Sequence, residues 1–147
     1  MKEERKGRVR KSTPLEANKE IDEKTIENIQ RYGYRSREAI DKRLTELTKE
    51  WDIEKTLEVN ASTLALTGLA LGAFVNRRWF ILPGVVASFL LQHGLQGWCP
   101  PLPLFRALKI RTRQEISEEV FALKAMRGDF KDLENKSPGE LLQTVRS

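Results

Sequence analysis

Charged and apolar residues are segregated along this chain. Two long stretches, residues 59–75 and 79–105, contain no Lys, Arg, Asp or Glu, and only residues 76–78 separate them. A membrane-spanning helix needs roughly 20 mainly apolar residues, because the hydrocarbon layer is about 30 Å thick and each helical residue rises about 1.5 Å. The second stretch meets this length comfortably and the first is close to the limit. The pattern predicts a transmembrane hairpin with spans at about residues 57–75 and 79–99.

The region before the hairpin divides into a tail and a helical part. Residues 1–20 are charged and poor in apolar side chains, so we expect a disordered tail. Residues 21–56 have a helical pattern that Gly33 is expected to interrupt. Four apolar residues in this part recur at spacings of four, three and four and so share one helical face. They are Ile40, Leu44, Leu47 and Trp51. This stripe can be buried on the membrane surface, in a dimer, or against the C-terminal helix, and plain helix packing is favoured.

Residues 106–147 follow the hairpin and are again rich in charge. Apolar and basic residues alternate at the start of this region, which suits anionic lipid headgroups. The periodicity then predicts a helix at about residues 115–127, with Gly128 as its stop. Ser137 and Glu140 have the spacing of a capping box, so a last short helix is expected to begin there.

Bulk composition alone would indicate a basic soluble protein. The chain has 147 residues, of which 32% are charged, with a mean hydropathy of -0.50 and a pI near 9.5. A net charge of +5 suits an anionic lipid surface or nucleic acid equally well, but the hairpin favours lipid and no nucleic-acid partner. No cleavable signal is recognisable, so the first span is expected to direct insertion. The predicted fold is all-α, a two-span transmembrane helical hairpin (residues 57–105) flanked by cytoplasmic amphipathic helices.

Small residues form a stripe along the first predicted span. Lipid tails are as apolar as leucine, so helices associate in a bilayer where small residues let their backbones approach closely. The stripe therefore predicts a contact face, used by the second helix of the hairpin or, alternatively, by a second copy in a homodimer. The stripe comprises Ala61, Ala65, Gly68 and Gly72, and Gly84 with Ser88 offers a matching surface on the second span.

The three tryptophans support the predicted span boundaries. Indole rings prefer the membrane interface, and Trp51, Trp79 and Trp98 all fall at predicted ends of the spans, so we expect them to act as interface anchors. Lys and Arg are concentrated outside the hairpin, which places both termini in the cytoplasm by the positive-inside rule. Arg77 and Arg78 in the turn count against this orientation.

His93 and Cys99 are the candidate functional residues of the second span. An ionisable group at membrane depth usually has a function or a specific partner. For His93 the favoured role is structural, a hydrogen bond across the hairpin to Asn60, Ser62 or Thr63. Cys99 precedes prolines, so the helix should stop at or just before Cys99, and a small packed cysteine is the default interpretation. No cofactor or metal is expected, because one Cys and one His cannot complete a four-ligand zinc site.

The end of the second span resembles a known family. Residues 93–100 read His-Gly-Leu-Gln-Gly-Trp-Cys-Pro, and the hairpin with this Gly-x-Cys-Pro ending is similar to the YgaP-like inner-membrane domains of bacteria. The resemblance covers about residues 51–108. It implies a two-span fold, placement in the bacterial inner membrane and a tendency to dimerise. Some relatives carry a rhodanese domain, which this chain lacks, so sulfurtransferase activity is not implied.

Three functions are compatible with these patterns. The favoured one is a non-catalytic, membrane-anchored interaction or scaffold subunit with a protein partner that the sequence does not identify. The alternative is a redox or sulfur-relay membrane component that uses Cys99, with His93 nearby. A soluble nucleic-acid-binding protein with a buried helical hairpin is supported by the pI alone.

Overall fold

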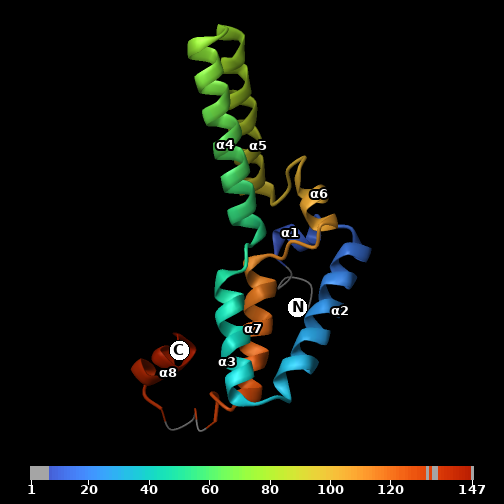
Figure 1. The fold of residues 1–147 in the computed structure, drawn as a ribbon, viewed down its shortest axis with the longest axis vertical. Helices are drawn as coiled ribbons and strands as arrows, with labels where there is room; N and C mark the ends of the chain where they lie inside the picture. Colours follow the sequence, from blue (N-terminus) through green and yellow to red (C-terminus); the bar gives the residue numbers. More distant parts are fainter. Residues whose placement is uncertain (1–6, 132, 134–135, 147) are drawn as a thin grey trace. The chain divides into compact units, whose positions relative to one another are not determined.

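The computed structural model is all-helical over the residues it describes, which are 7–131, 133 and 136–146. This confirms the all-α class. The chain forms two compact units, the first from residues 1–22 and 51–114 and the second from residues 23–50 and 115–147. The elements are α1 (Arg8–Lys11), α2 (Leu15–Gly33), α3 (Arg37–Lys49), α4 (Ile53–Phe74), the 3₁₀ helix η1 (Arg77–Phe80), α5 (Ile81–Gln96), α6 (Leu102–Ala107), α7 (Arg113–Arg127) and α8 (Pro138–Arg146) (Figure 1).

The N-terminal segment differs from the disordered tail expected over residues 1–20. Its first six residues lie outside the described part of the chain, but α1 and the start of α2 occupy most of the rest. The Thr13 hydroxyl donates to the carbonyl of Val9 (2.7 Å), and the Asn18 amide donates to the carbonyl of Arg10 (2.9 Å). These local bonds join α1 to α2 through polar side chains, and a prediction based on low apolar content overlooks them.

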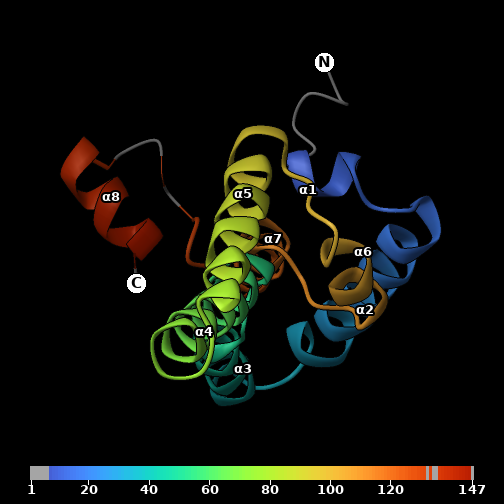
Figure 2. The same ribbon diagram turned by 90° about the horizontal axis from the view of Figure 1, so that it is seen from above.

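In the first unit, α4 and α5 form an antiparallel pair that lies side by side in both views (Figures 1 and 2). Asp52 precedes α4 as its N-cap, and its carboxylate accepts the backbone N–H of Lys55 at 2.7 Å. The turn begins at Asn76, whose side-chain oxygen accepts the N–H of Arg78 at 3.0 Å. α5 ends at Gly97, which has a φ of 72°, the left-handed conformation that commonly closes a helix.

The two helices of the hairpin differ in length. The helical stretch Arg37–Phe74 is long and apolar enough to cross a membrane by length and composition, and α4 is its apolar part. The 22 residues of α4 extend about 33 Å. α5 has 16 residues, or about 24 Å, because a 3₁₀ turn precedes it and Gly97 ends it two residues before the predicted boundary at Cys99. Cys99 therefore lies beyond the end of α5.

A small apolar core lies at the open end of the hairpin. It joins α1, the first turns of α4, the segment after α5, and α6. Its buried members are Val9, Ile53, Leu57, Cys99 and Leu102, with Trp98, Phe105 and Ile110 packed against them. The backbone N–H of Ile53 also donates to the carbonyl of Arg111 at 2.9 Å, which fixes the start of α4 to the chain that follows α6.

The basic segment after the hairpin does not present its arginines as predicted. Arg106 is fully buried, and its guanidinium donates to the side-chain oxygen of Asn18 (2.8 Å) and to the carbonyl of Ile110 (3.1 Å). Arg111 is also buried, with 5% of its surface exposed. A guanidinium has five N–H donors, so it can satisfy several acceptors inside a small core. These two arginines are therefore structural, and the expected contact with lipid headgroups does not apply to them.

The second unit is built on the stripe of α3. Ile40, Leu44 and Leu47 are buried against Ile116 and Leu123 of α7, which confirms packing on the C-terminal helix as the favoured alternative. The two helices run side by side in Figure 1. Trp51, the fourth predicted member of the stripe, belongs to the first unit and is 51% exposed.

Ion pairs and caps complete the second unit. The guanidinium of Arg43 on α3 lies 2.9 Å from the fully buried carboxylate of Glu119 on α7. Gly128, with a φ of 91°, follows α7 as predicted. The capping box is confirmed, because the N–H and the hydroxyl of Ser137 both donate to the Glu140 carboxylate at 2.7 Å and α8 starts at the next residue.

Candidate functional site at the hairpin

The hairpin leaves most of its apolar side chains uncovered. Only 22% of the most apolar 18-residue window of the Arg37–Phe74 stretch is buried inside the structure. Large side chains around both helices and the turn are between 45% and 89% exposed: Leu64, Leu66, Leu69, Phe74, Trp79, Ile81, Leu91 and Leu95. Soluble proteins rarely expose an apolar surface of this extent, and such surfaces mark contact with a membrane or with another protein.

The glycines of the predicted stripe lie where the two helices approach each other. A Cβ atom on Gly68 would lie 2.6 Å from Cδ of Pro83 and 3.0 Å from Cβ of Leu82. A Cβ atom on Gly72 would lie 2.8 Å from the ring of Phe80. The distances of 2.6 Å and 2.8 Å are shorter than real Cβ contacts, so a residue larger than glycine at either position would force a neighbour to move. The structure thus brings Gly68 against the start of α5 and Gly72 against η1 of the same hairpin.

The rest of the predicted contact surface is only partly brought together. Ala61 is buried and Ala65 is half-buried on the same face of α4. Gly84 faces open space, because a Cβ atom added there would have no neighbouring atom within 4 Å. Ser88 is exposed and donates to the carbonyl of Gly84 in its own helix at 2.9 Å. The expected matching surface on α5 is therefore not where the helices meet. Bulky residues of α5 and η1 pack against the two glycines of α4 instead.

Two of the tryptophans are exposed and one is not. Trp51 and Trp79 are 51% and 45% exposed, and the ammonium of Lys55 lies 4.8 Å from the centroid of the Trp51 ring. Trp98 is half-buried and packs on the apolar core of the first unit. Trp51 and Trp79 thus have the exposure that an interface anchor requires, whereas much of the Trp98 ring is covered by protein.

His93 lies in the last turns of α5 and lacks the predicted bond across the hairpin. Asn60 donates instead to the carbonyl of Thr56 at 2.9 Å, and Thr63 donates to the carbonyl of Val59 at 2.7 Å, both within α4. Among the described residues, the buried Nδ1 atom of His93 has no hydrogen-bond partner. Ser62 is exposed, as a residue turned away from the second helix would be.

The N-terminal segment closes the end of α5. The guanidinium of Arg8 donates to the carbonyl oxygens of Gly94 at 2.7 Å and Leu95 at 3.2 Å, which have no partner within their own helix. Gly97 passes so close to Arg8 that a Cβ atom on the glycine would overlap the Cβ atom of Arg8. The sequence did not predict this contact, because no local pattern relates Arg8 to a helix end 86 residues later.

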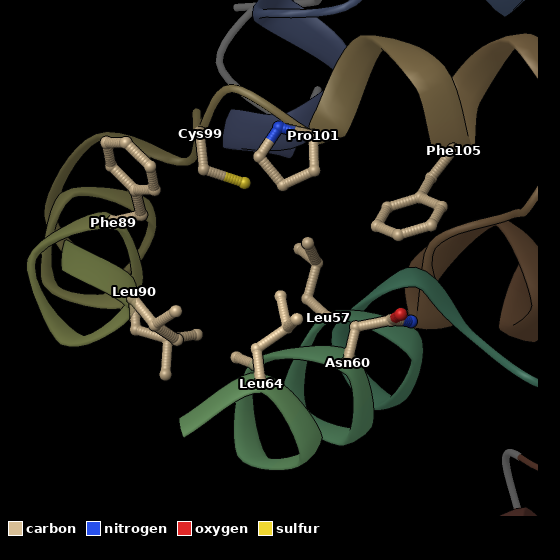
Figure 3. Close-up of a pocket in the computed structure, with 10 residues that line it drawn as sticks. Leu57, Asn60, Leu64, Phe89, Leu90, Cys99, Pro101 and Phe105 are labelled. Atoms are coloured by element: carbon tan, nitrogen blue, oxygen red, sulfur yellow. The ribbon is translucent and has the colours of Figure 1, made fainter. Parts of the chain in front are cut away.

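Cys99 is buried in the protein and is almost inaccessible to solvent. Its side chain is 2% exposed, and its sulfur points into a cavity of about 140 Å³ beside the apolar core (Figure 3). Burial raises the pKa of the Cys99 thiol, and a hydrogen bond from the backbone of Leu102 offsets only part of that shift. Since the thiolate is the reactive form of cysteine, a raised pKa disfavours the reactive form of this side chain.

The chain was compared with protein-family models, curated proteins and solved structures, and none of them matches it. The resemblance of residues 51–108 to the YgaP-like domains therefore stays a prediction that rests on the hairpin and its Gly-x-Cys-Pro ending. Within the described residues, no group of three or more His, Cys, Asp and Glu side chains is placed to hold a metal ion.

Proposed function

We propose that this chain is an integral protein of the bacterial inner membrane whose α4–α5 hairpin crosses the bilayer, with both termini in the cytoplasm. The observation that carries the proposal is the exposure of the hairpin. An apolar core helix of a soluble protein is mostly buried, whereas 22% of the most apolar window is buried here. Full burial of a leucine side chain contributes about 1.5–3 kcal/mol, so each of the hairpin leucines described above, 45% to 70% exposed, would gain roughly half of that on transfer to an apolar surrounding.

The backbone of the hairpin also suits a bilayer. The hydrocarbon layer is about 30 Å thick, and α4 extends about 33 Å. α5 is shorter, but η1 precedes it directly and adds about 8 Å, so residues 77–96 extend about 32 Å together. Arg77 and Arg78 lie at the far end of this segment, where their long side chains can reach water.

Within the membrane we propose a non-catalytic role as an interaction or scaffold subunit. The second unit supports this role, because it has its own apolar core and an ion pair between Arg43 and the buried Glu119, and so offers a folded surface separate from the hairpin. The redox alternative needs a reactive thiol at Cys99. The burial of that thiol and its raised pKa favour a structural cysteine instead.

Membrane extraction tests the location. We expect the chain to stay in the membrane pellet after washes with high salt and with alkaline carbonate, because an inserted hairpin is released only by detergent. Release by either wash would contradict the proposal and favour a soluble protein.

Reporter fusions test the orientation: reporters at Met1 and Ser147 should both read as cytoplasmic, and a tag between Asn76 and Arg77 should be reached from outside. Opposite locations of the two termini would refute the hairpin.

Crosslinking in native membranes tests the scaffold role. A photo-reactive residue at Tyr34, which is 84% exposed on the second unit, should give a defined protein adduct of constant stoichiometry. The matched control carries the same residue at Phe74, which is 89% exposed beside the hairpin turn and should give lipid adducts. Protein adducts that are absent or random at Tyr34 would contradict a scaffold.

A further inference from the structure

A cavity opens on the flank of the hairpin at its open end. Its walls come from three segments, and Figure 3 shows Cys99 and Phe105 facing Leu57 and Leu64 across it, with Phe89 and Leu90 along the side. The cavity has a volume of about 140 Å³. It lies entirely within the first unit.

The chemistry of the walls is apolar. Asn60 and Cys99 are the lining residues with polar side chains, and the other eight of the ten lining residues are apolar. One N–H of the Asn60 amide donates to the carbonyl of Thr56 (2.9 Å), and burial raises the pKa of the Cys99 thiol, which favours its neutral form. An ordered water needs two to four polar partners close together, and most of this wall offers none. The occupant should therefore be a hydrocarbon.

The size of the cavity limits what can enter it. An apolar protein cavity of about 150 Å³ contains no water and can bind a molecule of the size of benzene. The present cavity is of the same order, so it accepts a short segment of hydrocarbon, whereas a headgroup or a large ring system would not fit. The rest of a longer molecule would have to lie outside the opening.

We propose that this cavity binds a segment of one acyl chain of a membrane phospholipid. The inference rests on the proposed insertion of the hairpin. Leu64, Phe89 and Leu90 line the cavity and are 49%, 39% and 39% exposed, so its opening is continuous with the apolar surface that would face lipid. In a bilayer, acyl chains would surround the opening of this cavity. If the cavity stayed empty, the residues of its walls would lack dispersion contacts on that side. The bound chain would occupy the space that the sulfur of Cys99 faces.

Photo-labelling tests the proposal. The full-length protein is reconstituted in phosphatidylcholine vesicles that contain a phosphatidylcholine with a diazirine in one acyl chain, and the adducts are mapped by mass spectrometry. We expect adducts to concentrate on the cavity walls, at Leu57 and Phe105, although these side chains are far less exposed than Leu66 and Leu95 on the open surface of the hairpin.

A matched pair of variants makes the test specific. Leu64→Trp places a large side chain at the opening and should reduce cavity adducts about tenfold, which corresponds to about 1.4 kcal/mol. Leu66→Trp makes the same change two residues away at a position that is 67% exposed and outside the cavity, and should leave the adducts unchanged. Leu90→Trp blocks the opening from α5 and serves as a second variant if Leu64→Trp does not fold.

The outcomes separate this proposal from the proposed membrane location. Even labelling around the hairpin of a carbonate-resistant protein, or equal adducts in both variants, would overturn the acyl-chain site and leave the membrane location intact. A second protein chain seated in the cavity would exclude the lipid, so labelling of Leu66 and Leu95 without adducts at Leu57 and Phe105 would also overturn it. Release by carbonate would overturn both.

Discussion

Replacing Gly68 with alanine is expected to push the two helices of the hairpin apart. The new Cβ atom would lie 2.6 Å from Cδ of Pro83, whereas unstrained carbon atoms are about 3.5–4.0 Å apart, so roughly 1 Å must be gained. The neighbours at this point are a proline ring and the Cβ of Leu82 at 3.0 Å, and neither can move without its backbone. Overpacking of this kind costs about 1–3 kcal/mol.

Two other glycines provide the comparison. At Gly72 the obstacle is the ring of Phe80, which can rotate away, so Gly72→Ala should cost less than Gly68→Ala. Gly84 faces open space in the helix α5, so Gly84→Ala should stabilise the protein by about 0.5–1 kcal/mol through helix propensity alone. The same gain offsets part of the cost at Gly68, and leaves a net loss of up to about 2.5 kcal/mol.

The assay is the free energy of unfolding of the full-length protein in mixed micelles, obtained by titration with SDS and followed by circular dichroism. The expected order of stability is Gly84→Ala, wild type, Gly72→Ala and then Gly68→Ala. If Gly84→Ala were the most destabilised variant, the helices would meet through the small residues of α5, and the packing described for Gly68 and Pro83 would be wrong.

Two further predictions concern groups outside the helices of the hairpin. Cys99 should react slowly with maleimide at neutral pH and faster only as the pH rises above about 8.5, because burial raises the pKa of its thiol; rapid labelling below pH 7, measured by mass shift, would restore the redox alternative. The guanidinium of Arg127 lowers the pKa of Asp129 below its usual value of about 3.9. The pair therefore contributes its full stability above about pH 4, and this contribution is lost as the pH falls through the lowered pKa. Thermal unfolding at pH 7 and below pH 4 should show this loss in the wild type and a smaller one in Asp129→Asn; equal losses would show that the pair does not contribute.

Local patterns predicted most of the helices, because their causes are local. The Ser137–Glu140 capping box, the stop at Gly128 and the stripe of Ile40 on α3 all involve residues within a few turns of one another. The GxxxG pair likewise predicted which face of α4 meets a neighbour. A stripe of small residues predicts that another helix approaches closely, but it does not identify the residues that pack there. For this reason the predicted contact at Gly84 was wrong.

Contacts between distant parts of the sequence were not predictable in this way. Arg106 has the pattern of an exposed basic residue, and its burial depends on Asn18, 88 residues earlier. The closure of α5 by Arg8 and the cavity beside Cys99 likewise arise from segments that only the complete fold brings together. Apolar periodicity predicts which face of a helix is buried, but it does not identify the distant residues that cover that face.

The long-range bonds of Arg8 and Arg106 have a consequence for biosynthesis. The partners of Arg8 lie 86 and 87 residues later in the chain, and Arg106 follows its partner Asn18 by 88 residues. A ribosome makes about 5–20 residues per second, so the N-terminal segment must wait roughly 4–20 seconds before these partners exist. Both helices of the hairpin, α4 and α5, are synthesised before these bonds can form. The N-terminal segment therefore closes over the end of the hairpin only after both of its helices have been made.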